Sequence, residues 1–480
     1  MLVVSNNYKL KIDAPERRCV AKVEVYFNGP SAAPTVFEDD DISSFVLLEE
    51  ARAESESPLG RVSANELSLN LDNASRYFTP SNEGSPYFGK LLPNLKIVPF
   101  IGLDVGHPHT ESIEWIPLGV FWTGDWSAPS LSTEASVTCY DQLYRLGEIE
   151  LPPFPVMRNT TIAEMLKRLF TVLGLSSSEY AIDPTLKQYV RMGWLPRGKA
   201  WSAFQELATA GSCTIVADRQ GRIAAINNFR LTDSVATMDD VTQVFDMEIP
   251  QEYRNIFTST TVSNRHPSLD KLTTVLNMEN LEIPRGSNTF KSLEFSPGPI
   301  ASLSQLSLRG AKTSYINRLS YGAWTADIRI TNPGTPEIVS LYAEGIPIRV
   351  SESNVNRTDK PLATLYGVKE QVINSDLIQD ISVAREYVSL AGNIGLDPNA
   401  YVQANIRGNP AVELLDTITL ENPSDKFKEE EVVVLRSTIS YDGALSGTIH
   451  GIRKESLIVK DWVFISPGLF SLVPRHFELR

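Results

Sequence analysis

The sequence has few cysteines and few histidines. Its 480 residues contain five histidines and three cysteines, Cys19, Cys139 and Cys213. The cysteines lie far apart, form no CxxC pair and are odd in number, so they cannot build a disulfide framework or a cysteine-based zinc site. This usage indicates a chain that folds in a reducing compartment.

Long hydrophobic runs are also missing. No stretch approaches the ~18 uninterrupted apolar residues that a membrane-spanning helix needs. The apolar stretch near the N-terminus is too short for the core of a secretory signal peptide, and no small-residue cleavage site follows it. We therefore expect a soluble protein made in the cytoplasm, without stable membrane insertion.

The chain lacks an excess of positive charge. Lysine and arginine number 44 against 58 aspartates and glutamates, which gives a net charge of −14. This balance argues against a nucleic-acid binder or a membrane-surface protein, because both use basic patches. The hydrophobic share of 42% is ordinary for a globular protein, and the length suggests about three domains of roughly 150 residues.

Motifs of common catalytic sites are absent as well. The sequence contains neither the G-x-S-x-G of serine hydrolases nor the H-E-x-x-H of zinc proteases. The segment Gly84–Lys90 has the spacing of a phosphate-binding loop, but Leu91 offers no hydroxyl and Pro86 removes one backbone N–H. We interpret it as a polar loop. The paired carboxylates of a glycosidase have no fixed spacing, so that class stays open.

Three groups of residues could in principle bind a ligand. His107 and His109 could bind a metal, but a proline separates them and no further ligand is near, which favours a solvent-exposed loop. The acidic runs Asp39–Asp41 and Glu429–Glu431 are interpreted as solvated loops, with a weak hard-cation site as the alternative.

The third group is a cluster of tryptophans, Trp115, Trp122 and Trp126. They could form a platform that stacks on sugars, but bulky fillers inside a small barrel are the favoured interpretation. The sequence thus predicts no catalytic, cofactor-binding or metal-binding residue and no cofactor. It favours a structural or interaction protein, not an enzyme.

The first half of the chain predicts two kinds of module. Residues 1–150 are β-rich, with apolar side chains alternating in period two, and the density of short strands and turns favours a barrel or sandwich. Residues 151–235 predict a small α+β domain. It would have a capping box at 161–164, a second helix at 201–211 and a hairpin that turns at Asp218–Gly221.

The second half predicts a β-rich domain at 236–375, which would be a second barrel or a connecting domain. Residues 376–480 predict a helix through Leu377, Ile381 and Val388, followed by a closing β-barrel domain of antiparallel strands. The fold class is therefore mainly β with a small α+β insertion.

Several stretches resemble one known family. Residues 65–104 and 114–143 resemble the opening of bacteriophage tail-hub proteins, including a PLG-F-tryptophan pattern. Residues 384–395 and 404–420, with the text GNP-x-x-E-x-x-D, are similar to the closing barrel of the baseplate hub family, as is the glycine-rich hairpin at 440–454. The GNP text also has a plain explanation as a β-turn that leads into a strand.

This resemblance implies a specific architecture and function. Such hubs are homotrimers with two tube-type β-barrels per subunit plus smaller α/β modules, so three subunits present a pseudo-sixfold ring. The ring would dock under the sixfold tail tube or distal tail ring proteins, and the threefold lower surface would receive a central spike or tail fibre. DNA would only pass through the channel. The location would be the tail tip or baseplate of the virion, after assembly in the host bacterial cytoplasm.

Two alternatives stay open. The protein could be a glycan-binding or cell-wall-degrading tail-tip enzyme, although no lysozyme-like or peptidase domain is visible in the sequence. It could also be the hub of a related injection machine, such as a tailocin or a secretion-system spike.

Overall fold

The computed structural model describes residues 1–51, 60–106, 112–228, 231–239, 241–250, 256–397, 399–422 and 427–457. The chain is mostly β, which confirms that part of the sequence prediction. None of the helices in these ranges is long and apolar enough to cross a membrane. The helices are α1 (Asn6–Ile12), α2 (Gln142–Gly147), α3 (Ile162–Val172), α4 (Ala200–Gly211), α5 (Lys360–Tyr366) and α6 (Ile381–Leu396).

Apart from the short segment at 61–62, the strands of the first 141 residues form one half of a large sheet, in the order β2-β1-β6-β8-β9-β5-β3, with β7 paired to β6. Period-two alternation places one face of each strand in a common core. On β5, for example, Leu67, Leu69 and Leu71 are fully buried. The strands are β1 (Cys19–Tyr26), β2 (Thr35–Glu38), β3 (Ile42–Glu50), β5 (Glu66–Asp72), β6 (Lys96–Asp104), β7 (Ile113–Pro117), β8 (Phe121–Ser127) and β9 (Glu134–Asp141).

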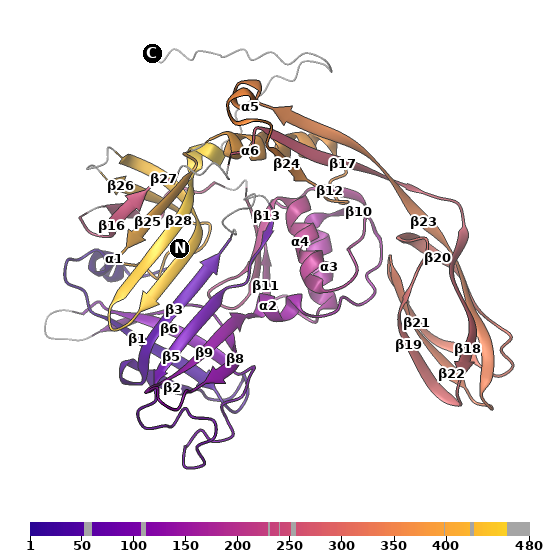
Figure 1. Ribbon diagram of the computed structural model, residues 1–480, viewed down its shortest axis with the longest axis horizontal. Coiled ribbons are helices and arrows are strands. Elements are labelled where there is room, and N and C mark those ends of the chain that lie inside the picture. The colour runs from indigo at the N-terminus through magenta and orange to yellow at the C-terminus, as the bar shows by residue number, and fades with distance from the viewer. Residues whose placement is uncertain are drawn as a thin grey trace.

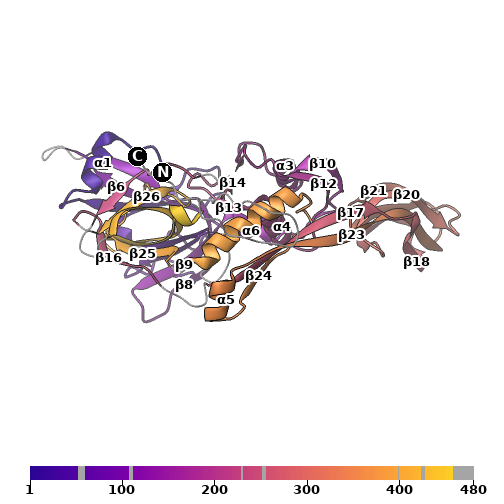
Figure 2. The same ribbon diagram turned by 90° about the horizontal axis from the view of Figure 1, so that it is seen from above.

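The other half of this sheet comes mainly from the C-terminal part of the chain and curves around a second apolar core (Figure 2). Here the order is β16-β25-β28-β27, while β26 pairs with both β27 and β15. Its strands are β15 (Thr237–Asp239), β16 (Val244–Glu248), β25 (Tyr401–Ile406), β26 (Thr417–Asn422), β27 (Phe427–Tyr441) and β28 (Leu445–Arg453).

One long strand, β27, joins the two halves. Its first part pairs with β26, and residues 436–441 pair antiparallel with residues 45–50 of β3. The two halves therefore form one continuous 14-stranded sheet, although they surround separate cores.

A small α+β module lies beside this sheet, with α3 and α4 against its strands (Figure 1). The predicted capping box is confirmed: the Thr161 hydroxyl accepts the Glu164 N–H at 3.3 Å, and the Glu164 carboxylate accepts the Thr161 N–H at 2.9 Å. The predicted hairpin is confirmed as β13 paired with β14. The strands of the module are β10 (Met157–Thr161), β11 (Tyr180–Ile182), β12 (Tyr189–Gly193), β13 (Cys213–Ala217) and β14 (Ile223–Asn227). The short strand β4 (Arg61–Val62) pairs with β13.

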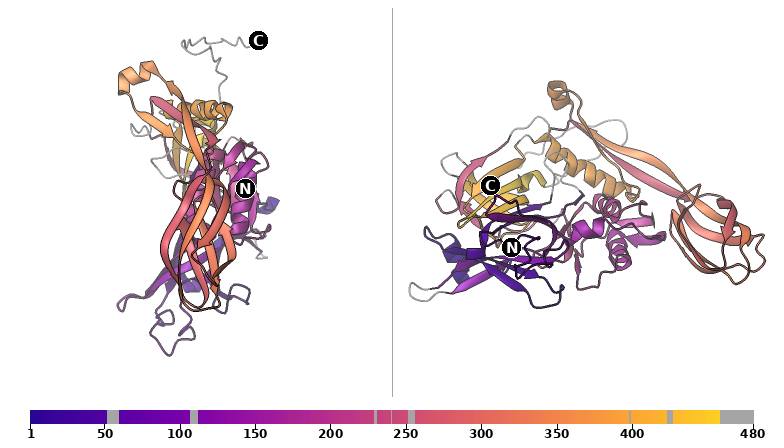
Figure 3. Two further views of the ribbon diagram at one scale, coloured as in Figure 1. Left: turned by 90° about the vertical axis from the view of Figure 1, so that its right-hand side faces the viewer. Right: turned by 60° about the horizontal axis from the view of Figure 1, so that its bottom comes forward.

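A β-arm extends from the body and ends in a distal lobe (Figures 1 and 3). The arm consists of β17 (Ser259–Leu269), the 22-residue β23 (Glu337–Thr358) and β24 (Glu370–Ile373). In the lobe, two sheets enclose a separate apolar core. They contain the outer part of β23 together with β18 (Thr273–Ile283), β19 (Gly286–Glu294), β20 (Ile300–Arg309), β21 (Tyr315–Tyr321) and β22 (Thr325–Asn332).

The helix predicted through Leu377 begins later. The Asp380 carboxylate accepts the Ser382 N–H at 2.8 Å and caps α6, so the helix starts at Ile381. Leu377 is buried in the loop before it. The domain boundaries at 150, 235 and 375 stay predictions.

Candidate functional site

The GNP segment lies at a junction of several parts of the chain. Gly408 has a φ of 91°, which lets the chain turn sharply after β25, and β26 begins at Thr417. The Arg17 guanidinium from the first part of the chain donates to the Gly408 carbonyl at 3.0 Å. The predicted turn that leads into a strand is confirmed, but its backbone carbonyls also bind other parts of the molecule.

A buried ion pair ties the β13–β14 hairpin to the main sheet. From the hairpin turn, Arg219 donates through Nε to Glu49 Oε1 at 2.8 Å and through Nη2 to Oε2 at 2.6 Å. Its Nη1 donates to the Pro410 carbonyl at 2.6 Å. Burial lowers the pKa of Arg219, but the charge and hydrogen bonds of Glu49, together with the charge of Glu413, outweigh that effect, and the net pKa is raised. A bidentate guanidinium–carboxylate contact of this kind fixes orientation as well as distance.

The two acidic residues of the GNP motif bind the start of the chain. The amino group of Met1 lies 2.5 Å from Asp416 Oδ1 and 3.3 Å from Glu413 Oε2. Burial raises the pKa of Glu413, while the positive charges of the amino group and Arg219 act in the opposite direction. The N-terminus and the β13–β14 hairpin therefore both contact the GNP motif, and Arg219 links this junction to β3.

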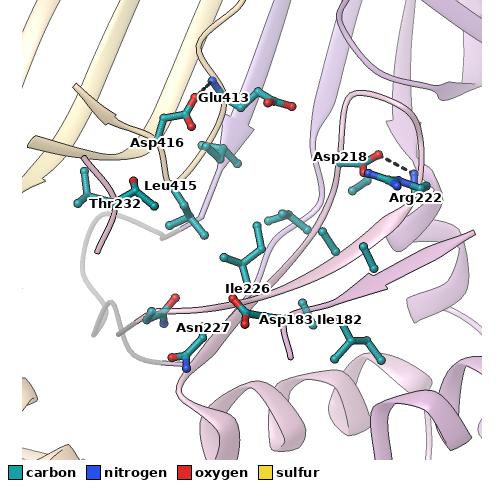
Figure 4. A pocket seen from close by; sticks show the side chains of 18 of the residues that line it. Ile182, Asp183, Asp218, Arg222, Ile226, Asn227, Thr232, Glu413, Leu415 and Asp416 are labelled. Atoms are coloured by element: carbon teal, nitrogen blue, oxygen red, sulfur yellow. Dashed lines mark hydrogen bonds and ion pairs between the residues drawn. The ribbon is translucent and has the colours of Figure 1, made fainter. Parts of the chain in front are cut away.

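A cavity of about 510 Å³ opens beside this junction (Figure 4). Polar side chains from the hairpin and from the GNP segment line it, and Arg222 forms a 2.7 Å ion pair with Asp218 at its rim. Within the ranges that the structure describes, no cluster of three His, Cys, Asp or Glu side chains could hold a metal ion. The paired charges suit a joint between modules better than a reaction site.

The segment Gly84–Lys90, which has the spacing of a phosphate-binding loop, is a surface loop. Lys90 Nζ donates to the carbonyl of Pro86, and the Tyr87 ring stacks on Phe78 with centroids 5.3 Å apart. The segment has neither helix nor strand, which confirms its interpretation as a loop. His107 and His109 lie outside the described residues.

At least one carboxylate of each acidic run is paired, so the prediction of solvated loops is wrong for Asp39 and Glu430. Asp39 Oδ1 accepts the Ala21 N–H at 2.6 Å and the Tyr441 hydroxyl at 2.8 Å, which connects β1 to β27. Glu430 accepts two hydrogen bonds from Arg453 at 3.0 and 3.1 Å. These carboxylates hold strands together.

The tryptophan cluster is half-buried, so the prediction of core packing is wrong for two of its members. Lys22 Nζ lies 4.7 Å from the centre of the Trp115 ring, and the Arg145 guanidinium lies 4.6 Å from that of Trp122. Trp126 does pack against the first core. Cations cover the two rings, which is a stabilising arrangement at a partly exposed site.

Sequence reasoning missed two buried carboxyl groups. Asp141 accepts the Asn65 N–H at 2.7 Å and the Tyr144 N–H at 3.0 Å, and burial raises its pKa to about 7. Burial also raises the pKa of Glu206, which accepts the Ser375 hydroxyl at 2.7 Å. Neither lines the cavity. Carboxylates at these positions give no local signal in the sequence, because their burial depends on distant segments.

Comparison with known proteins gives the fold. No protein-family model matches the sequence, and no curated protein matches it. Among solved structures, the 43 kDa tail protein of prophage MuSo2 from Shewanella oneidensis matches with a TM-score of 0.51 and 9% identity, over 92% of this chain and 100% of that chain. A tail protein from Neisseria meningitidis MC58 matches with a TM-score of 0.51 and 8% identity, over 92% and 98%.

The chain has the fold of these tail proteins. The resemblance seen in the sequence is therefore confirmed at the level of fold. Because the match spans nearly the whole of each chain, it includes the main sheet, the α+β module and the arm together, and no large part of this chain lies outside it.

Proposed function

We propose that the protein is a structural phage tail hub: a homotrimeric adaptor between the sixfold tail tube and a threefold central spike or fibre. The observation that carries this proposal is the likeness to two tail proteins, one of them from a prophage, over 92% of the chain. Its partners would be the tail tube or distal tail ring proteins above and the spike or fibre below. It would belong to the virion tail tip, after assembly in the host cytoplasm.

The two halves of the 14-stranded sheet are the proposed tube-type barrels. Each surrounds its own apolar core, and β27 runs through both. Two barrels in each of three subunits would give six similar units around one axis, which is the geometry that a sixfold tube requires. We propose domains at 1–150, 151–235, 236–375 and 376–480 for this arrangement.

The charge of the chain supports a channel through which DNA passes without binding. With a net charge of −14, acidic side chains on the wall of such a lumen would repel phosphates, whereas stable DNA binding depends on lysine and arginine contacts to the backbone.

We further propose that the protein is not an enzyme. Two of the carboxyl groups with raised pKa, Asp141 and Glu206, each accept hydrogen bonds that join separate segments. A peptidoglycan turnover assay tests the rival tail-tip enzyme: activity that disappears in Asp141→Asn or Glu206→Gln would favour the enzyme.

The oligomeric state tests the hub directly. Light scattering on the purified full chain should give about three times the 53.2 kDa of one chain. A monomer at micromolar concentration would contradict the proposal, because closed rings of this kind need large interfaces between subunits.

A further inference from the structure

The distal lobe presents a polar sheet face formed by β19, β22 and β21, in that order. The central strand β22 shows how the sheet is oriented. Its residues Ala326, Ile328 and Ile330 are at most 1% exposed and belong to the lobe core, whereas Arg329 on the opposite face is exposed. Side chains that share the face of Arg329 therefore point away from the core.

Two arginines lie directly opposite each other on this face. Arg318 of β21 pairs in register with Arg329 of β22, and both are exposed. Side chains that are opposite on an antiparallel pair are close neighbours, and like charges there are destabilising. Neither guanidinium has an ion-pair or hydrogen-bond partner among the residues that the structure describes. The pair is thus an unfavourable arrangement that an anion would relieve.

The two nearby acidic side chains contact groups other than these arginines, and the single N–H bond to Asp327 leaves its negative charge in place. Asp327 Oδ1 accepts the Ser292 N–H at 2.8 Å, and Glu294 forms a 2.5 Å ion pair with Arg197 of the α+β module. Lys291, also exposed, adds a further positive charge in the bulge of β19. The face is locally basic in a chain whose net charge is −14.

The neighbours of the arginines are hydroxyl groups, an amide and one aromatic ring. Thr289 of β19 lies opposite Arg329. Thr331 lies opposite Tyr315, which is 53% exposed. The Thr331 hydroxyl accepts a hydrogen bond from Asn317 Nδ2 at 3.4 Å. This combination offers several donors and acceptors beside a ring that a sugar could stack on.

We propose that this face, named here the arginine face (Arg318, Arg329, Lys291, Tyr315 and their hydroxyl neighbours), binds an anionic polysaccharide. Paired guanidinium groups match carboxylate, sulfate or phosphate groups in a bidentate way. A protein partner is less suited, because protein interfaces are built around an apolar core and the outward side chains of β22 are polar. The inference concerns the lobe and does not depend on the hub proposal.

Binding of the full chain to polygalacturonate tests the proposal, with neutral dextran and polyglutamate as comparison probes. We expect salt-sensitive binding to polygalacturonate, no binding to dextran and much weaker binding to polyglutamate. The double variant Arg318→Gln/Arg329→Gln should bind polygalacturonate at least tenfold more weakly. Its melting temperature should equal or exceed that of the wild type, because a like-charge pair is removed.

The matched control is Lys271→Gln/Lys312→Gln, which removes two exposed positive charges from the same lobe outside this sheet. It should bind as the wild type does. Equal losses of affinity for polygalacturonate in the two double variants would show that only the net charge of the lobe matters, and would overturn the proposal. Binding to polyglutamate as tight as to polygalacturonate would also overturn it, in favour of an acidic protein partner. An absence of polygalacturonate binding by the wild type would refute it outright.

Discussion

Arg219 is the residue at which three separated segments meet, since it binds Glu49 of β3, Pro410 of the GNP segment and, through its position in the hairpin turn, the α+β module. Removal of one partner leaves the other charge buried without compensation. Arg219 and Glu49 are 3% and 4% exposed, so little water reaches the pair in the folded chain.

We therefore expect Arg219→Ala to lower the free energy of unfolding by about 3–5 kcal/mol. The measurement is urea denaturation followed by intrinsic fluorescence. Arg222→Ala is the matched control, because its ion pair with Asp218 is partly exposed and should contribute less than about 1 kcal/mol. Similar losses in the two variants would contradict the role assigned to Arg219.

Asp141 should make stability depend on pH in an unusual direction. Its pKa is raised by burial to about 7, above the value of 3.8 for a free carboxyl. Between these values the folded chain holds a proton that the unfolded chain has released, so stability from this group falls as pH rises from about 4 to 7.

We expect the stability of Asp141→Asn to fall less than that of the wild type as the pH rises towards 7, because asparagine does not titrate. Thermal unfolding from pH 5 to pH 8 measures it, with the difference between variant and wild type as the readout. A constant difference across that range would show that Asp141 does not titrate there.

At the scale of elements, glycines decide how closely the last hairpin packs. A Cβ atom at Gly451 would lie 2.2 Å from Val432 Cγ1 and 2.8 Å from the Val433 carbonyl oxygen. This explains a glycine in the segment 440–454, because β28 must approach β27 closely at Gly451.

We expect Gly451→Ala to destabilise the protein by about 1–3 kcal/mol through overpacking. Gly84→Ala is the control, since its nearest neighbour would be a flexible side-chain atom 3.3 Å away on an exposed loop. Thermal melting of both variants compares them. An unchanged melting temperature for Gly451→Ala would contradict the prediction, because it would show that β28 can move away from β27 without loss of stability.

The elements that the sequence predicted well are those with local signals. The capping box of α3, the helix α4 and the hairpin at Asp218–Gly221 all depend on residues within a few positions of each other. The start of α6 was misplaced, because an apolar residue such as Leu377 fits a helical pattern and also fits a buried loop. The shared strand β27 and the contact of Arg219 with Glu49 join residues that are far apart in sequence, and spacing alone cannot predict them.

At the scale of the whole molecule, the fold has two parts. The continuous sheet and its two cores form the body, while β17 and β23 carry the lobe away from it (Figure 1). In the proposed assembly the body closes a ring and the arginine face lies on the lobe. The buried Arg219–Glu49 pair would then fix the α+β module to the ring, so that variants at this joint should reduce trimer yield as well as stability.

Electron microscopy of the purified protein tests the central claim most directly. Averages of particles viewed along their main axis should show threefold symmetry, with six cylinder-like densities around an open channel. A particle without a central channel, or one with twofold symmetry, would contradict the account.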